Sequence, residues 1–251
     1  GTAPSAESDF AREWLPVNDT QIGPFSQLHT HEERYLRTVE LETLGLQEDF
    51  RLGPELLLRV NAASADAGST RTLVGITSAA GYTWALGNGL VRVFGGNSVE
   101  YAASGQHDAV CWLNARIASP RLGFGRLIAD GAFRERYMNY LNLRYGLGGD
   151  TRLRGYPTSG FQKSFSGAHY FAANLEFRTA SVDILTAQTG LAAFYDVGHA
   201  ARRFVDLTPH QSVGLGLRIL LPQASRTVFR ADWAFPLNPV PGTSTFPGGF
   251  F

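Results

Sequence analysis

Residues 73–91 read LVGITSAAGYTWALGNGLV, and this stretch decides between a helical and a β-sheet protein. It is long enough, and free enough of charge, for a helix to span a bilayer. However, its residues alternate with a period of two. Glycine, threonine and alanine occupy most of one parity, and the other carries Val74, Ile76, Ala80, Tyr82, Trp84 and Leu86. Because side chains of a strand alternate between two faces, the stretch predicts a β-strand with one apolar face.

The same alternation recurs along the chain, and turn-forming dipeptides such as Asn88-Gly89 separate the runs. No comparable stripe with a helical period appears. We expect about eleven or twelve strands, the first near residue 25 and the others at 34–44, 51–63, 72–86, 89–102, 107–118, 122–136, 138–146, 168–180, 185–199, 211–221 and 226–237. Many of them reach the roughly 9–11 residues that a tilted membrane strand needs.

The composition excludes several classes of protein. The 251 residues carry 22 Lys+Arg and 22 Asp+Glu, so no net charge favours nucleic acid or another polyanion. Charged residues make up 18%, below the roughly 25% of an ordinary soluble domain. Lys163 is the only lysine, so the other basic residues are arginine, the cation suited to buried pairing. Cys111 is alone, which excludes a disulfide framework and a cysteine metal site.

A bilayer offers no water to backbone polar groups, so a sheet that spans it must close on itself. Lipid then covers the apolar parity, and the interior takes the charged residues and glycine. Long alternating strands, few charges and many glycines fit this arrangement. The sequence therefore predicts an all-β, antiparallel transmembrane β-barrel. A large soluble β-sandwich or a lipocalin-like, lipid-binding barrel also alternates and is the alternative.

One loop carries a family motif. Leu153-Arg154-Gly155-Tyr156 matches the (V/L)-R-G-(F/Y) motif of the BamA/TamA superfamily of outer-membrane assembly factors and two-partner secretion transporters. Downstream, residues 174–178 (NLEFR) resemble the family's S/N-L-E-(F/Y)-R strand, and residues 194–198 (FYDVG) resemble its F-x-D-x-G strand. The resemblance rests on matched motifs over about 138–240. Before residue 138 it rests only on the alternating pattern and spacing of the strands.

The resemblance implies a barrel of sixteen strands, of which this length accommodates about twelve, with a long loop folded into the lumen and the motif at its tip. It implies insertion or translocation of proteins at the bacterial outer membrane without covalent chemistry. The expected partners are outer-membrane lipids, client outer-membrane or secreted proteins, and periplasmic domains of the same protein outside this segment. The alternative function is a passive pore, or a membrane anchor for a fused enzyme or other domain.

The residues themselves suggest how the loop is held. The strand parities place Glu176 and Asp196 in the lumen on neighbouring strands, where Arg154 on the loop can reach both. A guanidinium can engage two carboxylates at once, Gly155 permits a tight turn, and Tyr156 can pack on the wall. With Phe194 and Gly198 of the matched strand, these residues are the predicted lumen partners of the loop. Ordinary lumen charge pairing without a special loop is the alternative.

The remaining expectations concern boundaries and chemistry. Residues 1–24 are predicted to be a linker or lead-in segment, and 25–251 the barrel domain, which stops inside its final strand. We expect no catalytic residue, no cofactor and no metal. His29 and His31 share a strand face, but no third ligand can be assigned to them.

Overall fold

The computed structural model describes residues 10, 14–149, 152–156, 158–159, 162–163, 165–241 and 248–250. They form a 13-stranded antiparallel sheet, which confirms the all-β prediction. In spatial order its path is β1 (Phe25–His31), β3 (Gln47–Ala63), β4 (Leu73–Leu86), β5 (Gly89–Ala102), β6 (Asp108–Ala118), β7 (Gly125–Asn139), β12 (His169–Thr179), β14 (Ala187–Ala201), β15 (His210–Leu220), β16 (Phe229–Pro236) and β17 (Gly249–Phe250).

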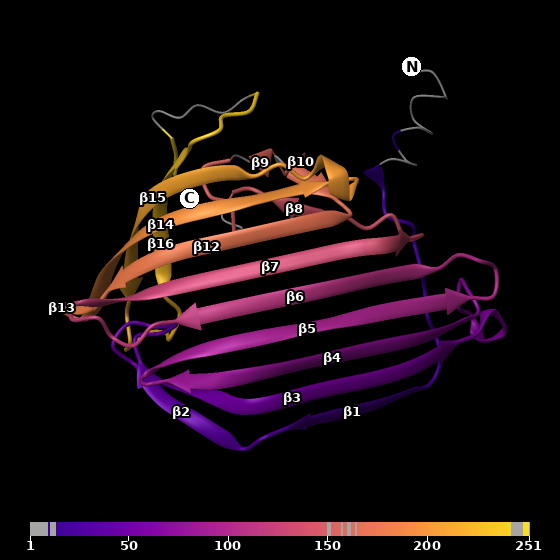
Figure 1. Ribbon diagram of the computed structural model, residues 1–251, viewed down its shortest axis with the longest axis horizontal. Coiled ribbons are helices and arrows are strands. Elements are labelled where there is room, and N and C mark those ends of the chain that lie inside the picture. The colour runs from indigo at the N-terminus through magenta and orange to yellow at the C-terminus, as the bar shows by residue number, and fades with distance from the viewer. Residues whose placement is uncertain are drawn as a thin grey trace.

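Short elements complete the description. The strands β2 (Arg34–Val39) and β13 (Val182–Ile184) join the large sheet beside β3 and β14. Two separate ladders pair β8 (Tyr145–Leu147) with β11 (Phe165–Gly167), and β9 (Thr158–Ser159) with β10 (Gln162–Lys163). The 3-10 turns η1 (Ala65–Ala67) and η2 (Phe204–Asp206) lie in connections. The large sheet is strongly curved, and β16 lies behind its front strands (Figure 1).

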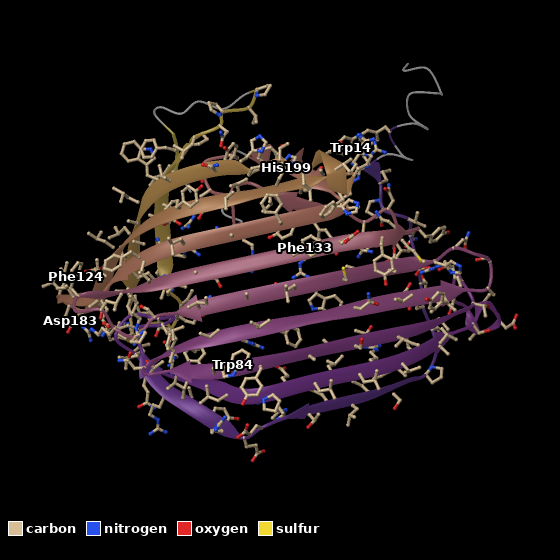
Figure 2. All side chains as sticks on the ribbon, in the orientation of Figure 1. Trp14, Trp84, Phe124, Phe133, Asp183 and His199 are labelled. Carbon is tan, nitrogen blue, oxygen red and sulfur yellow. The ribbon has the colours of Figure 1, made fainter. Side chains whose placement is uncertain are left out.

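The two faces of the curved sheet are opposite in character to those of a soluble sheet. The convex face exposes large apolar side chains, among them Trp84, which is labelled in Figure 2. The other exposed apolar side chains of this face include Leu56, Leu58, Val60, Val74, Ile76, Leu113, Ile117, Leu175, Leu191, Leu215 and Leu217. The concave face buries polar groups, among them Arg126, Glu176, Asp196, Ser212, Arg218 and Asp232. The predicted parities are therefore confirmed, with the apolar side facing out.

No helix among the described residues is long and apolar enough to cross a membrane.

The predicted strand over 138–146 is wrong. Strand β7 continues to Asn139, and the chain then turns. The Asn139 side chain bonds the backbone N–H and C=O of Leu143 at 2.9 and 3.0 Å, and Asn142 adopts a positive φ of 51°. A short polar side chain that bonds the nearby backbone competes with a strand ladder, which explains the break.

The predicted strand over 34–44 also ends early, at Val39. The carboxylate of Glu48 accepts the backbone N–H groups of Leu41, Glu42 and Thr43 at 2.7–3.1 Å. This replaces the ladder bonds and turns the 40–46 segment inward, where Leu41 and Leu44 are buried. The 40–46 segment thus packs on the concave face instead of extending the wall.

Connections of two kinds meet at opposite ends of the strands. We call one of them the loop end; the connections at this end are 64–72, 103–107, 140–168 and 202–209. We call the other the turn end; the connections at this end are 40–46, 87–88, 119–124, 180–186 and 221–228. The long 140–168 connection therefore begins and ends at the loop end.

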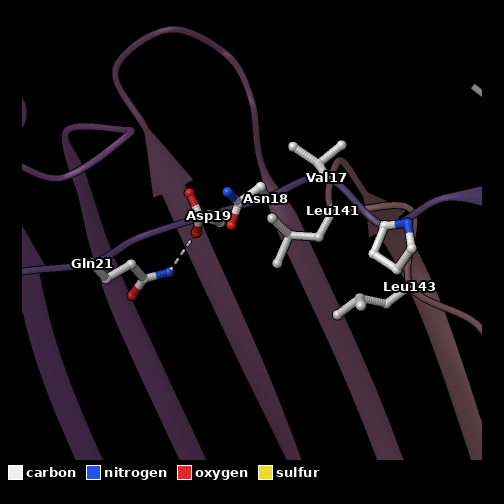
Figure 3. A pocket seen from close by; sticks show the side chains of 7 residues that line it. Val17, Asn18, Asp19, Gln21, Leu141 and Leu143 are labelled. Atoms are coloured by element: carbon white, nitrogen blue, oxygen red, sulfur yellow. Dashed lines mark hydrogen bonds between the residues drawn. The ribbon is translucent and has the colours of Figure 1, made fainter. Parts of the chain in front are cut away.

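Residues 14–24, which we call the N-terminal strap, cross the loop end before entering β1. Figure 3 shows Val17 and Asp19 of the strap beside Leu141 and Leu143. Arg71 donates to both oxygens of Asp19 at 3.0 and 2.6 Å and to Glu100 at 2.8 Å. The Arg71 guanidinium holds the pKa of Asp19 well below its usual range. The stabilisation that this ion pair gives the strap is therefore fully present above the ordinary carboxyl pKa. It is lost only when the pH falls through the lowered pKa of Asp19.

Leu215→Arg should destabilise the protein in a lipid bilayer by about 2–4 kcal/mol, because Leu215 stands mid-strand on the convex face with 63% of its surface exposed. Denaturant unfolding in phospholipid vesicles measures the effect. Val205→Arg, in the 202–209 connection, is the matched control and should change stability little. Equal stability of the two variants would contradict a lipid-covered convex face.

Asp19→Asn should loosen the N-terminal strap and leave the sheet folded. The amides of Val17 and Ile22, which bond the Leu141 carbonyl and the Ser69 hydroxyl, should exchange with deuterium about tenfold faster or more. The exposed Asp66→Asn in η1 is the control. Unchanged exchange at both amides would show that the Asp19–Arg71 pair does not hold the strap.

Candidate functional site: the loop on the concave face

The loop between β7 and β12 packs on the concave face of the sheet. Its β8–β11 ladder brings Leu147 and Phe165 against the wall, and Leu153 and Tyr156 are fully buried in the same apolar cluster. The wall contributes Ala132 of β7, Tyr170 and Ala172 of β12, and Ala200 of β14. Packing of the loop thus fills the interior of the curved sheet.

Arg154 extends from this loop onto the carboxylates of the wall. Its Nε and Nη2 donate to the two oxygens of Asp196 at 2.8 Å each, and its backbone N–H donates to the same carboxylate at 3.1 Å. Its Nη1 donates to Glu176 at 3.2 Å and to Asp232 at 3.1 Å. The Arg154 side chain is 4% exposed and that of Asp196 is 0% exposed. One guanidinium therefore joins three wall strands.

The surrounding groups fix the geometry of this contact. Asn174, beside Asp196 in the β12–β14 register, donates to Asp196 at 2.8 Å and to the Arg152 carbonyl at 2.6 Å. The Phe194 ring lies under the Arg154 guanidinium, 3.3 Å from its centroid to Cζ. Phe194 in turn covers Gly214, where a Cβ would stand 2.3 Å from the ring. A glycine opposite Phe194 is therefore required for the ring to lie flat.

The rest of the motif follows the predicted roles in its geometry. Gly155 has a φ of 93°, and a Cβ there would stand 3.2 Å from the Pro236 nitrogen, so the tip needs glycine. Tyr156 donates its hydroxyl to the Gln211 and Asn238 carbonyls at 2.9 and 3.1 Å. Burial raises the pKa of Tyr156, which keeps that donor proton in place. Gly198 leaves room for Leu147, since a Cβ there would lie 3.1 Å from Leu147 Cδ1.

Sequence reasoning missed part of the network. Asp232 of β16 bonds Arg154. Three further arginines bond the carboxylates that Arg154 contacts. Arg178 donates to Glu176 at 2.8 Å, Arg218 donates to Glu176 at 3.2 Å and to Asp232, and Arg230 donates to Asp232 at 3.1 Å. The available signal was parity, because Arg218 occupies an inward position of β15, the neighbour of β14, and Asp232 occupies an inward position of β16, the next strand along.

The two histidines considered for a metal lie elsewhere. His29 bonds Glu55 at 3.1 Å on the β1–β3 pair, and its ring meets His31 edge to face at 5.4 Å. Among the described residues, no group of three or more His, Cys, Asp or Glu side chains could hold a metal ion.

The fold and the loop define a class: an antiparallel wall with an apolar outer face and an inner loop held by buried ion pairs. The model of the Omp85 superfamily domain matches residues 84–248, a span that includes β5 through β16, the loop and every member of the Arg154 network. The chain belongs to the Omp85 superfamily, a family of outer-membrane proteins that insert or translocate proteins. The resemblance to BamA/TamA-type proteins is confirmed at this level. No curated protein matches the chain in a sequence search.

A double-mutant cycle on Arg154 and Asp196 should show strong coupling. Arg154→Ala or Asp196→Ala alone should each destabilise the protein by about 3–5 kcal/mol, because either leaves a buried charge without its main partner. The double variant should cost less than the sum by about 1–3 kcal/mol. Unfolding in detergent micelles measures stability, and hydrogen exchange of residues 152–156 reports loop release.

The exposed pair Arg203–Asp206, 2.7 Å apart at the loop end, is the matched control and should show little coupling. Arg154→Lys should resemble Arg154→Ala more than the unsubstituted protein, since one ammonium cannot reproduce the fork on Asp196. Additive effects of Arg154 and Asp196, with the loop equally protected in every variant, would remove the pinning role.

Proposed function

We propose that this chain is the outer-membrane barrel region of a BamA/TamA-type protein that assists the insertion or translocation of other proteins at the bacterial outer membrane. The observation that carries the proposal is the Arg154 network, which ties a family-matched loop to β12, β14 and β16. A loop attached to three strands at one point can couple its own position to the arrangement of the wall.

The chemistry proposed for this function is backbone pairing rather than a covalent step. An edge strand presents unpaired N–H and C=O groups, on which an extended client segment can add by β-augmentation. In the described part of the sheet, β1 has β3 as its neighbour on the large-sheet path, which leaves its other side available for pairing. The chain is accordingly proposed not to be an enzyme.

The proposed partners follow from the two faces of the sheet. Acyl chains of outer-membrane lipids would cover the apolar convex face, which displays leucine, valine and tryptophan side chains. Client outer-membrane or secreted proteins would be engaged through strand pairing. Both proposals agree with the general behaviour of the superfamily.

Vesicles carrying the complete gene product should accelerate folding of a urea-denatured outer-membrane barrel by roughly tenfold, equivalent to about 1.4 kcal/mol of barrier. Depletion of the protein from its bacterium should lower the level of other outer-membrane barrels. Asp196→Asn should weaken both effects, because it releases the Arg154 fork, whereas the exposed Asp206→Asn should preserve them.

A stable open conductance in planar bilayers, with unchanged outer-membrane protein levels after depletion, would favour a passive pore instead. The complete gene sequence separates the other alternative: periplasmic repeats before this segment would support assembly or transport, and an appended hydrolase would support an anchor.

A further inference from the structure

A second polar site lies at the turn end, on the concave side. The inward 40–46 segment and the ends of β12, β15 and β16 enclose a cavity of about 350 Å³. Its lining is formed by Glu42, Thr43, Leu44, Arg178, Arg218, Arg226, Val228 and Arg230. Half of these residues are arginines, which is unusual for a cavity in a chain with equal numbers of acidic and basic residues.

The carboxylates near these arginines are already engaged. Arg178 and Arg218 share Glu176, while Arg218 and Arg230 share Asp232. Both carboxylates also bond Arg154 on the loop. The connected network among the described residues thus sets four guanidiniums, those of Arg154, Arg178, Arg218 and Arg230, against the carboxylates of Glu176, Asp196 and Asp232. One positive charge in it is uncompensated.

Two further cavity residues complete the charge count. Glu42 forms an ion pair with Arg116 of β6 at 2.8 Å, and Arg116 also pairs with Asp130, so this group carries one net negative charge that offsets the excess of the network. Arg226, on the connection between β15 and β16, donates to the Gln47 carbonyl at 2.8 Å, a neutral acceptor that leaves its charge in place. The net positive charge around the cavity is therefore that of Arg226, at its exposed side.

A buried hydroxyl provides an independent indication of a ligand. Thr43 lines this cavity, and its Oγ1 atom is buried and has no hydrogen-bond partner among the described residues. A buried hydroxyl without a partner is destabilising, by an amount comparable to a lost hydrogen bond. Rotation of the Thr43 side chain toward the cavity would let an oxyanion there accept its proton and relieve that cost.

We propose that this cavity is a binding site for a phosphate group. A phosphate carries the charge that offsets the arginine excess, and its oxygens match the forked donors of guanidinium groups. Arg226 and Arg230 hold it at the accessible side, Arg178 and Arg218 lie at the base, and Thr43 donates from the inward 40–46 segment. The phosphate belongs either to free inorganic phosphate or to the headgroup of an anionic lipid.

The test uses the full chain folded in maltoside micelles, whose headgroups contain no phosphate. Calorimetric titration with inorganic phosphate at constant ionic strength should give saturable binding that chloride does not reproduce. Arg226→Gln should weaken this binding about tenfold, and Arg226→Gln with Arg230→Gln should weaken it about a hundredfold. Thr43→Val should weaken it severalfold.

Arg203→Gln is the matched control, because Arg203 is an exposed arginine at the opposite end of the sheet. It should bind phosphate like the unsubstituted protein. Arg226→Lys keeps the charge and should retain most of the affinity. Retained heat-modifiable migration in gels shows that each variant is folded.

The source of the phosphate is distinguished by a second titration with dioctanoyl phosphatidic acid, compared with dioctanoyl glycerol. Tighter binding of the phosphatidic acid than of inorganic phosphate identifies a lipid headgroup, and the reverse order identifies free phosphate. Phosphate binding no stronger than that of chloride, or an equal loss in Arg203→Gln and Arg226→Gln, would overturn the proposal.

Discussion

The buried fork between Arg154 and Asp196 is the contact on which the interior depends. A guanidinium cannot lose its charge, so burying it requires carboxylates that are themselves held in place. Asn174 and the backbone N–H of Arg154 supply that support for Asp196, and Glu176 and Asp232 engage the remaining guanidinium nitrogen. A partly formed network would be more costly than an apolar interior, so the loop, the three strands and the supporting side chains must be in place together.

The outer face imposes a second constraint with the same consequence. The apolar side chains of each strand point to the convex face and so cannot pack against the loop, which lies on the concave face. The concave face therefore has to provide both the packing and the charge pairing that hold the loop. It does so in two zones: the cluster of Leu147, Leu153, Tyr156 and Phe165 toward the loop end, and the ion network beside it. The glycine at position 214 is part of this arrangement, since a side chain there would displace Phe194 from beneath the guanidinium.

The sequence predicted the orientation of the wall residues because a strand has a strict period of two, so one apolar run fixes the face of every residue in it. That rule placed Glu176 and Asp196 on the inner face. It failed at 138–146 and 34–44, where the residues alternate but side chains of Asn139 and Glu48 take over the backbone bonds. It also left Asp232 and Arg218 unassigned. Parity gives the face on which a residue lies, but it does not give the residue's position along the strand relative to the loop.

The equal numbers of acidic and basic residues conceal an uneven distribution in space. At the loop end, the single cation of Arg71 faces two carboxylates, those of Asp19 and Glu100, and the bonds among them tie the N-terminal strap to the sheet. At the turn end, the arginines around Glu176 and Asp232 outnumber the carboxylates that they share. Arg230 is half exposed and Arg226 beside it is exposed, so a counter-charge can reach both through the cavity beside Thr43. Glu176 and Asp232 also bond Arg154. An anion bound at the turn end would therefore compete with these two carboxylates for Arg178, Arg218 and Arg230, and it would change how tightly the loop is held.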